Sequence, residues 1–450
     1  MATSAPVAPA RRAALRLLRR VDDGGAYVAR LGADPAVAAL GPADRRHVTE
    51  LVAGITRQRR WLDFLVEALA GRPLDRLSGA VRGVLHIGLY ELLVVATPAH
   101  AAIHEAVALA RAAGQARAAG LVNAVLRQAD RRRDDLPAPD TGDAVEDLAI
   151  RASHPTWLVR RWVERFGRAD AEALLAWNNR RPVHCLRVNL LRATVADVTA
   201  ALDARGIAWS PSPRCDDVLH VPRLQPVLAS GLIEQGLAVV QDESAAWVVR
   251  ALDPRAGETV VDACAAPGGK ALYAAARMGD HGRVVACDLR AERLAPLTRA
   301  AEAQGITIVE TLAGDFRDLV ARSAVPVADR VLLDAPCTGS GVLAKRADLR
   351  WRRAPEDLDA LCALQRALLD AAARSVRPGG CLVYGTCSIE PEENEAQVAA
   401  FLARHAEFAL EPVGDAVPPE LVTPAGCLAT LPQRHGMDGA FAARLRRAAP

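Results

Sequence analysis

Two cysteines and one aspartate stand at the positions where this sequence is best able to do chemistry. Asp334 and Cys337 close one predicted buried strand, Arg330–Cys337, and Cys387 lies near the end of another, Cys381–Ser388. A thiolate suits a pyrimidine acceptor, because its addition to C6 makes C5 nucleophilic enough to accept a methyl group. The Asp334 carboxyl can hydrogen-bond N3 and the amino edge of a cytosine, and a second thiol can assist release. The pattern therefore favours covalent catalysis on an unstacked base.

The alternative for any buried cysteine is the role of an inert, small apolar residue. We assign that role to four others, Cys185, Cys264, Cys287 and Cys381. Cys337 and Cys387 differ from these because each stands among turn-forming residues at a strand end, where reactive groups are displayed.

A glycine-rich stretch organises the chain around these residues. Val260–Lys270 reads V-V-D-A-C-A-A-P-G-G-K, in which a β-branched strand runs into Pro267-Gly268-Gly269, and an apolar helical pattern follows from Ala271 to Met278. Strand, glycine turn and helix form the first unit of a doubly wound α/β domain. Backbone N–H groups and the helix N-terminus at such a turn attract a negative group of a ligand.

Two common nucleotide-binding motifs are missing from this stretch, and their absence narrows the choice of ligand for the turn. A Walker A loop would have glycine in place of Cys264 and a hydroxyl residue in place of Ala271, and the G-x-G-x-x-G pattern of dinucleotide sites is missing. S-adenosylmethionine remains, with Asp288, at the end of the predicted strand Val284–Asp288, placed to hold the ribose hydroxyls. The competing interpretation is a tight turn of any α/β protein.

Further elements complete the predicted catalytic domain. We expect a third strand at Ile306–Leu312, a helix at Leu361–Val376 stopped by Pro378-Gly379-Gly380, and a last strand at Ala440–Leu445. Asp315 follows the third strand, where it could meet an adenine amino group. Ligands of open α/β sheets bind beyond the carboxyl ends of the strands. Six residues would lie at that rim: Gly268, Asp288, Asp315, Asp334, Cys337 and Cys387.

The rest of the chain predicts two further domains. Residues 1–10 are expected to be disordered, and the pattern from Ala13 to about Arg133 is that of an all-α bundle, followed by a Pro-containing linker. Residues 141–240 predict a small α+β module with strands at Cys185–Asn189 and Val218–Val221. The expected domains are therefore 1–140, 141–240 and 241–450, the last with Asp242 or Ser244 as the cap of its first helix.

Length and composition agree with a multidomain globular chain. The 450 residues imply two to four domains, 51% are hydrophobic, and charges interrupt every apolar run before it could span a membrane. The N-terminus lacks an apolar signal core. The nine cysteines include no C-x-x-C pair, so neither a zinc site nor a disulfide framework is predicted, and we expect a reducing, cytoplasmic compartment.

Charge is distributed unevenly along the chain. Residues 1–133 hold 20 Arg against 11 acidic residues, a net of +9, whereas the remainder has a net of −6. A basic helical region indicates contact with nucleic acid, or else a solvated helical surface. Lys270 and Lys345 are the only lysines of the chain. This pattern indicates that an ammonium group is needed at these two positions, and the alternative explanation is chance.

Together these motifs resemble those of a known family. D-A-C-A-A-P-G-G-K, L-L-D-A-P-C-T-G-S-G-V and Y-G-T-C-S-I-E-P-E-E-N-E resemble the motifs of the RNA cytosine-C5 methyltransferases. I-G-L-Y-E-L-L, P-A-H-A-A-I-H-E-A-V and G-L-V-N-A-V-L-R-Q look like the domain related to the antitermination factor NusB. The pairing resembles the bacterial enzymes that modify 16S rRNA, and it covers nearly the whole chain.

The resemblance implies a fold, a partner and a set of roles. The fold would be a Rossmann-like S-adenosylmethionine-dependent methyltransferase domain preceded by an all-α NusB-like bundle and a small α+β module. Cys387 would be the nucleophile, Cys337 the release cysteine, and Asp334 a further catalytic group. The cofactor would be bound by Cys264, Ala265, Ala266, Pro267, Gly268, Gly269, Lys270, Asp288, Asp315 and Asp334. We expect 16S rRNA as partner, no membrane, no metal, and a monomer.

Two departures and two alternatives remain. Ala271 stands where the family often has threonine, and Arg346-Ala347-Asp348 replaces the usual R-x-P-D, which leaves the local turn open. An RNA-binding antitermination-type protein with a vestigial methyltransferase domain would be expected to lose Cys387 or the glycine turn, and both are present. A methyltransferase acting on another RNA, on DNA or on protein is the second alternative.

Overall fold

The computed structural model describes residues 8–22 and 34–449, and the chain divides into two compact units. Unit 1 comprises Met1–Arg180 and Leu343–Arg353, and unit 2 comprises Arg181–Val342 and Ala354–Pro450. The prediction of disorder for residues 1–10 lies largely outside the described residues. The first helix begins at Pro9.

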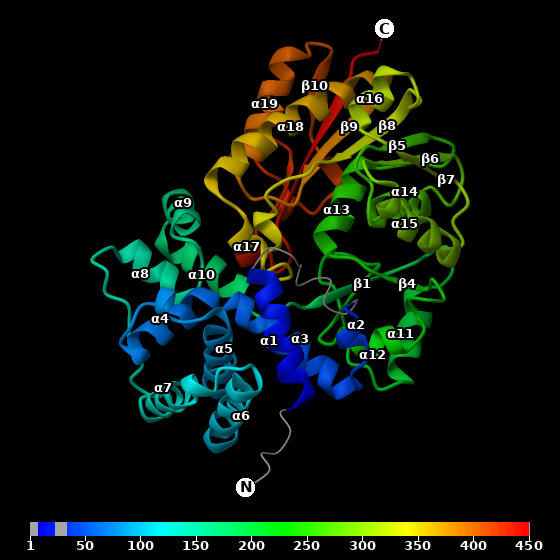
Figure 1. Cartoon of the computed structure of the whole chain (residues 1–450). Coiled ribbons are helices and arrows are strands. Elements are labelled where there is room, and N and C mark those ends of the chain that lie inside the picture. Colours follow the sequence, from blue (N-terminus) through cyan, green and yellow to red (C-terminus); the bar gives the residue numbers. More distant parts are fainter. Residues whose placement is uncertain (1–7, 23–33, 450) are drawn as a thin grey trace. The chain divides into compact units, whose positions relative to one another are not determined.

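Unit 1 is helical in its described part (Figure 1). Its helices are α1 (Pro9–Asp22), α2 (Pro35–Ala38), α3 (Pro42–Arg57), α4 (Arg59–Ala70), α5 (Gly79–Leu93), α6 (Ala99–Ala112), α7 (Ala119–Arg131), α8 (Ala144–Arg151), α9 (Thr156–Phe166), α10 (Arg168–Asn179) and α17 (Leu349–Arg352). The predicted central helix is α5, which is buried along almost its whole length. Ser78 starts it, because its hydroxyl accepts a hydrogen bond from the Val81 N–H at 3.3 Å.

The segment Leu343–Arg353 belongs to unit 1 although it follows Cys337 in sequence. Arg350 is 1% exposed, and its guanidinium donates to Asn179 Oδ1 at 2.8 Å and to the Asn178 carbonyl at 3.0 Å. Trp351 donates from its indole Nε1 to the Thr56 carbonyl at 2.7 Å. These buried polar contacts join α17 to the helices of the unit.

Unit 2 contains a small antiparallel sheet with strand order β2-β3-β1-β4. The strands are β1 (His184–Val188), β2 (Ser210–Pro211), β3 (Val218–Val221) and β4 (Ala238–Val240), and the helices are α11 (Val195–Asp203) and α12 (Leu224–Ala229). Both strands predicted for this segment are confirmed. Asn189 ties the sheet to the larger domain by donating from Nδ2 to the Gln304 carbonyl at 2.9 Å.

The main sheet of unit 2 has eight strands in the order β10-β12-β9-β8-β5-β6-β7, with β11 paired to β12. The strands are β5 (Thr259–Asp262), β6 (Arg283–Asp288), β7 (Val309–Ala313), β8 (Ala328–Asp334), β9 (Val376–Thr386), β10 (Phe408–Glu411), β11 (Leu428–Thr430) and β12 (Ala440–Arg447). β5 to β9 are parallel to one another, and β12 joins β9 antiparallel. The chain order reverses between β5 and β8, which is where ligands bind in such sheets.

Helices cover both faces of this sheet (Figure 1). They are α13 (Glu243–Leu252), α14 (Gly269–Arg277), α15 (Ala291–Gln304), α16 (Phe316–Ala321), α18 (Pro355–Arg374), α19 (Glu395–Arg404) and α20 (Pro432–His435). Val260 packs into the core that holds α13 to α15, and its neighbour Val261 into the core that holds α16, α18 and α19. Successive strand residues point to opposite faces, so a continuous apolar run is what a doubly covered sheet needs. Asp242 is the cap of α13, with Oδ1 accepting from the Ser244 N–H at 2.9 Å.

Several predicted boundaries are wrong. The helix predicted to begin at Leu361 begins at Pro355, and the strand predicted to reach Cys337 ends at Asp334. Pro378-Gly379-Gly380 does not stop the helix, which ends at Arg374, but lies inside β9 where the pairing with β8 is irregular. Gly379 has φ +72°, and a Cβ on Gly380 would lie 2.9 Å from the Asp329 carbonyl, so the glycines serve a bulge in a strand. The third strand starts at Val309 rather than Ile306.

Candidate active site

The carboxyl ends of β5, β6, β8 and β9 gather most of the predicted site residues. Between β8 and β9, the N–H of Ala335 donates to the Gly385 carbonyl at 2.8 Å. Between β5 and β6, the N–H of Ala265 donates to the Cys287 carbonyl at 2.7 Å. The loops after these strands are therefore cross-linked by backbone hydrogen bonds, and the side chains that they carry share one rim of the sheet.

The glycine turn makes close approaches that a side chain would block. Gly268 has φ +109°, and a Cβ on it would lie 2.5 Å from Cγ of Leu297. α14 begins at the next residue, Gly269, so its first N–H groups face the rim. Ala266 and Pro267 are joined by a cis peptide bond. The turn thus presents backbone donors and a helix N-terminus, as predicted.

Asp288 closes β6 beside this turn and is 4% exposed. Its Oδ2 accepts from the Ala266 N–H at 3.3 Å, and its Oδ1 accepts from the Arg290 N–H and from Arg293 Nη1, both at 3.2 Å. The carboxylate is held against the turn at the position expected for a group that meets a ribose.

Lys270 and Asp334 form an ion pair across the rim. The ammonium Nζ donates to Asp334 Oδ2 at 2.7 Å, and the side chains are 18% and 29% exposed. Burial alone would lower the pKa of Lys270, but the Asp334 carboxylate outweighs it and raises the pKa, so the ammonium keeps its proton at neutral pH.

Asp262 is a site residue that the sequence analysis missed. It is 1% exposed at the end of β5, where Oδ1 accepts from the Cys264 N–H at 3.3 Å, while Oδ2 accepts no hydrogen bond from the described residues. Burial, and then the charge of Asp334, raises the pKa of Asp262 to about 7. An acid at the end of a buried strand, like Asp288, was the signal that could have found it.

The two predicted reactive cysteines lie side by side. The sulfur atoms of Cys337 and Cys387 are 3.3 Å apart, and neither cysteine is in a disulfide. The hydrogen bond with Cys387, and then burial, raises the pKa of Cys337 well above its usual range. The sequence thus correctly predicted that these thiols come from neighbouring strand ends.

A buried network fixes the turn that carries Cys337. Glu393 is fully buried, and its carboxylate accepts from the Thr338 N–H at 2.9 Å, from the Thr338 hydroxyl at 2.5 Å and from Gln365 Nε2 at 2.9 Å. The Tyr384 hydroxyl donates to the Glu393 carbonyl at 2.5 Å. Glu393 lies in the motif with Cys387, yet its role depends on Gln365, a contact that spacing alone does not show.

A second set of contacts fixes the turn that carries Cys387. Asn394 Nδ2 donates to the Ser388 carbonyl at 2.9 Å, and the Thr386 hydroxyl donates to Asn394 Oδ1 at 2.6 Å. The Gly341 N–H donates to the Cys387 carbonyl at 3.0 Å, and a Cβ on Gly341 would lie 2.8 Å from that oxygen. Both thiols are therefore carried by turns whose buried polar groups are paired.

Asp315 follows β7 at the same rim but has a different set of partners. It is the N-cap of α16, and its carboxylate forms a two-point ion pair with Arg317, at 3.0 and 2.6 Å. The hydrogen bond with Arg317 lowers the pKa of Asp315. Among the described residues, its side chain makes no hydrogen bond to the residues of the glycine turn or the cysteine pair.

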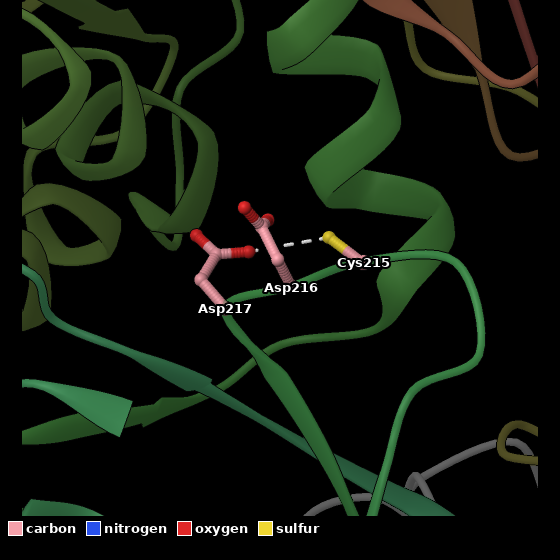
Figure 2. A group of neighbouring side chains, drawn as sticks. All are labelled: Cys215, Asp216 and Asp217. Carbon is pink, nitrogen blue, oxygen red and sulfur yellow. Dashed lines mark hydrogen bonds between the residues drawn. The ribbon is translucent and has the colours of Figure 1, made fainter. Parts of the chain in front are cut away.

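A separate cluster in unit 2 joins Cys215, Asp216 and Asp217 (Figure 2). The Cys215 thiol donates to Asp217 Oδ1 at 3.2 Å, and Arg250 pairs with both carboxylates, with Nη2 at 2.9 Å from Asp217 Oδ1. Burial, and then Asp217, raises the pKa of Cys215, which keeps the sulfur protonated. Arg250 balances the charge of both carboxylates, so the cluster is held together by these ion pairs and by the hydrogen bond that the Cys215 thiol donates.

Comparison with known proteins decides the family. A curated relative from Synechocystis sp., named probable ribosomal RNA small subunit methyltransferase B, is 37% identical over 420 residues, which span 91% of this chain and 92% of the relative. The chain belongs to the ribosomal RNA small subunit methyltransferase B family. A relative of the same name from Bacillus subtilis is 33% identical, again over 91% and 92% of the two chains.

Three family models divide the chain of this rRNA methyltransferase. The NusB family matches residues 8–131, the ferredoxin-like domain of RsmF/B-like methyltransferases matches 154–228, and the 16S rRNA methyltransferase RsmB/F matches 249–446. The predicted fold class is thereby confirmed, with its NusB-like bundle, small α+β module and Rossmann-like methyltransferase domain.

Solved structures agree with this assignment. The crystal structure of PH0851 matches with a TM-score of 0.80 at 29% identity and covers 99% of this chain and 100% of that chain. A methyltransferase homolog from Pyrococcus horikoshii matches with a TM-score of 0.58 at 27% identity, over 68% of this chain and 99% of that chain. Within the described ranges, none of the helices is both long and apolar enough to cross a membrane.

Proposed function

We propose that this rRNA methyltransferase methylates C5 of a cytosine in 16S rRNA, and that Cys387 forms a transient bond to C6 of that base. The observation that carries the proposal is the pair of sulfur atoms 3.3 Å apart at the ends of β8 and β9, beside the Lys270–Asp334 ion pair. Nitrogen and oxygen acceptors of RNA have lone pairs of their own. Only a carbon acceptor such as C5 needs a thiolate to activate it.

The rim fits S-adenosylmethionine as cofactor. The unpaired Oδ2 of Asp262 is an acceptor for an ammonium group, and the turn at Gly268 presents backbone N–H groups and the N-terminus of α14. Asp288 can hold ribose hydroxyls. We further propose that Asp315 lies near the adenine of the cofactor and that the turn residues from Cys264 to Lys270 also bind the cofactor. When bound, the cofactor supplies the methyl group.

Lys270 and Asp334 would orient the cytosine. The Asp334 carboxylate accepts from the amino group and from a protonated N3, which draws electrons from C6. The ammonium of Lys270, 2.7 Å from Asp334 Oδ2, holds this carboxylate in place. The base must be unstacked from its RNA helix before it can enter.

The two thiols would then divide the covalent work. The resemblance of the Y-G-T-C-S motif to the RNA cytosine-C5 methyltransferases assigns the attack on C6 to Cys387. The hydrogen bond with Cys387, and then burial, raises the pKa of the Cys337 thiol beside it. C5 uses the electrons of the former double bond to take the methyl group. The C5 proton then passes to a water molecule, the electrons of the C5–H bond re-form the double bond between C5 and C6, and the C6–S bond breaks to return the Cys387 thiolate. Cys337, 3.3 Å from that sulfur, is placed to assist this release.

We propose domains at 1–140, 141–240 and 241–450, and we propose that the protein is a monomer. We also propose a cytoplasmic site of action, since ribosomal RNA is modified where ribosomes assemble. Contacts between residues divide 141–240 between the two units at Arg180. A vestigial methyltransferase domain is disfavoured by the intact turn and by both cysteines.

The modified nucleoside tests the proposal. Unmodified 16S rRNA should be incubated with the enzyme and S-adenosylmethionine, digested and analysed by mass spectrometry, with bisulfite sequencing to locate the site. We expect 5-methylcytidine at one bisulfite-resistant cytosine. A methylated nucleoside of another kind would refute C5 chemistry, and 5-methylcytidine formed only in another RNA would refute the substrate.

A further inference from the structure

A cavity of about 300 Å³ lies within unit 1, and none of the residues assigned to catalysis lines it. It is bounded by α1, α3, α5 and α17 and by the first residue of α4. Its polar lining includes Arg19, Thr56, Arg59, Asp348, Trp351 and Arg352. Sites for small molecules begin at about this size and combine an apolar wall with a few convergent polar groups.

Asp348 is the unusual member of this lining. It is 2% exposed, yet neither carboxylate oxygen accepts a hydrogen bond from the described residues, and its one ion contact is with Arg352 Nε at 3.4 Å. It precedes α17 at the N-cap position, but its side chain does not accept from the helix N–H groups as an N-cap aspartate normally does. A buried carboxylate with empty acceptor sites calls for a donor from a ligand.

The other groups of the cavity suit a flat, anionic molecule. Trp351 offers an aromatic face, and the Arg59 guanidinium carbon lies 6.0 Å from its ring centroid. Arg19 is exposed at the edge of the cavity. The Thr56 hydroxyl is 3% exposed and has no hydrogen-bond partner among the described residues. An aromatic wall with arginines at its edge is how proteins hold a base together with its phosphate.

The pattern of donors selects one base. The two free oxygens of a carboxylate pair best with two adjacent donors, and among the neutral bases only guanine presents them, at N1–H and the 2-amino group. Adenine and cytosine offer one amino group beside an acceptor, and uracil offers one N–H between two acceptors. We propose that this cavity binds a guanine nucleotide, with Asp348 on N1–H and the 2-amino group, Thr56 available to O6, Trp351 against the base and the arginines toward phosphate.

The guanine could come from an RNA strand or from a free nucleotide, and the chemistry is the same for both. We favour a guanosine of the RNA that the enzyme methylates, and this choice of source rests on the proposed function. The pocket itself does not, because nucleotide binding can be measured without methyl transfer.

The ligand can be changed by one group to test the pairing. Binding of GMP, IMP and AMP to the full chain should be measured by calorimetry, alongside unstructured oligouridines that carry one central guanosine or inosine. Inosine lacks only the 2-amino group. We expect about tenfold or greater preference for guanine over hypoxanthine, the base of inosine and IMP, in at least one of the two series. The reason is that loss of the 2-amino group leaves a buried carboxylate oxygen unpaired. Preference in the oligonucleotides alone assigns the source to RNA, and preference in the mononucleotides alone assigns it to free nucleotide.

Variants locate the preference. Asp348→Asn, which keeps the shape of the side chain, should abolish it, and the exposed Asp134→Asn, with the same change of charge in unit 1, should retain it. A far-ultraviolet circular dichroism spectrum and an unfolding transition like those of the wild type show that the variants are folded. The absence of a guanine preference in both series, or its persistence in Asp348→Asn, overturns the proposal. Loss of methylation with an intact preference would instead refute the proposed function alone.

Discussion

Replacing Glu393 by alanine is expected to destabilise the protein and to loosen the turn that carries Cys337. The carboxylate is fully buried and receives three hydrogen bonds, two from Thr338 and one from Gln365. A hydrogen bond to a charged group contributes about 1.5–3 kcal/mol, and unpaired buried donors add a desolvation cost. Because part of this is recovered by water or by rotation of the hydroxyl, we expect Glu393→Ala to lower the free energy of unfolding by about 3–5 kcal/mol.

Glutamine at the same position is the informative comparison. Its carbonyl oxygen can still accept from the Thr338 N–H and from Gln365, and its amino group can donate to the Thr338 hydroxyl. That hydroxyl can then turn toward Ser388 Oγ, 3.2 Å away. We therefore expect Glu393→Gln to cost only about 1–2 kcal/mol, since one charge-assisted bond is replaced rather than lost.

Denaturant unfolding, calorimetry of S-adenosylmethionine binding and the decay rate of the covalent protein–RNA complex check this reasoning together. Glu393→Ala should reduce the rate of product release more than it weakens cofactor binding, because Glu393 is a positioning residue for Cys337. The exposed Glu395→Ala, two positions further along, is the control. It should change neither the free energy of unfolding nor the activation free energy of product release by more than about 0.5 kcal/mol. Equal destabilisation by alanine and glutamine would show that the hydrogen bonds to Glu393 do not stabilise this turn.

Three further predictions follow from the rim and from the basic bundle. Asp288→Ala should weaken S-adenosylmethionine binding by about 1–3 kcal/mol in calorimetry, because the ribose loses a charged acceptor. The folded-state pKa of Asp262, about 7, lies above its unfolded value, so its contribution to stability is full below about pH 4 and is lost as pH rises to about 7. Unfolding experiments on the wild type should therefore show a loss of roughly 4 kcal/mol over that range that Asp262→Asn does not show. Arg12 and Arg16 are exposed on α1. Replacing them by glutamine should make the slope of log affinity for rRNA against log salt concentration shallower by about 0.7–0.9 per residue, and an unchanged slope would place the RNA elsewhere.

The strands and the reactive groups could be predicted because their signals are local. A β-branched run followed by a glycine turn or by a carboxylate identifies β5 and β6 from neighbouring residues alone. The two cysteines were correctly placed together because parallel strands end at one edge of a sheet.

Features that depend on distant contacts could not be predicted in this way. Pro378-Gly379-Gly380 has the composition of a helix stop, but pairing with β8 turns it into a bulge. The role of Glu393 depends on Gln365, which lies 28 positions away in sequence. The residues around Leu343–Arg353 in sequence give no sign that this segment packs with the helices of unit 1. There, Arg350 donates hydrogen bonds to Asn178 and Asn179 at the end of α10.

A denaturing gel tests the central claim most directly. Wild type, Cys337→Ala and Cys387→Ala are each mixed with 16S rRNA and S-adenosylmethionine, and covalent protein–RNA complexes are separated by their slow migration. Cys387 should attack and Cys337 should act only in release, so a slow band should accumulate for Cys337→Ala and be absent for Cys387→Ala. The reverse pattern would exchange the two roles, and full methylation by Cys387→Ala would contradict covalent catalysis by this pair.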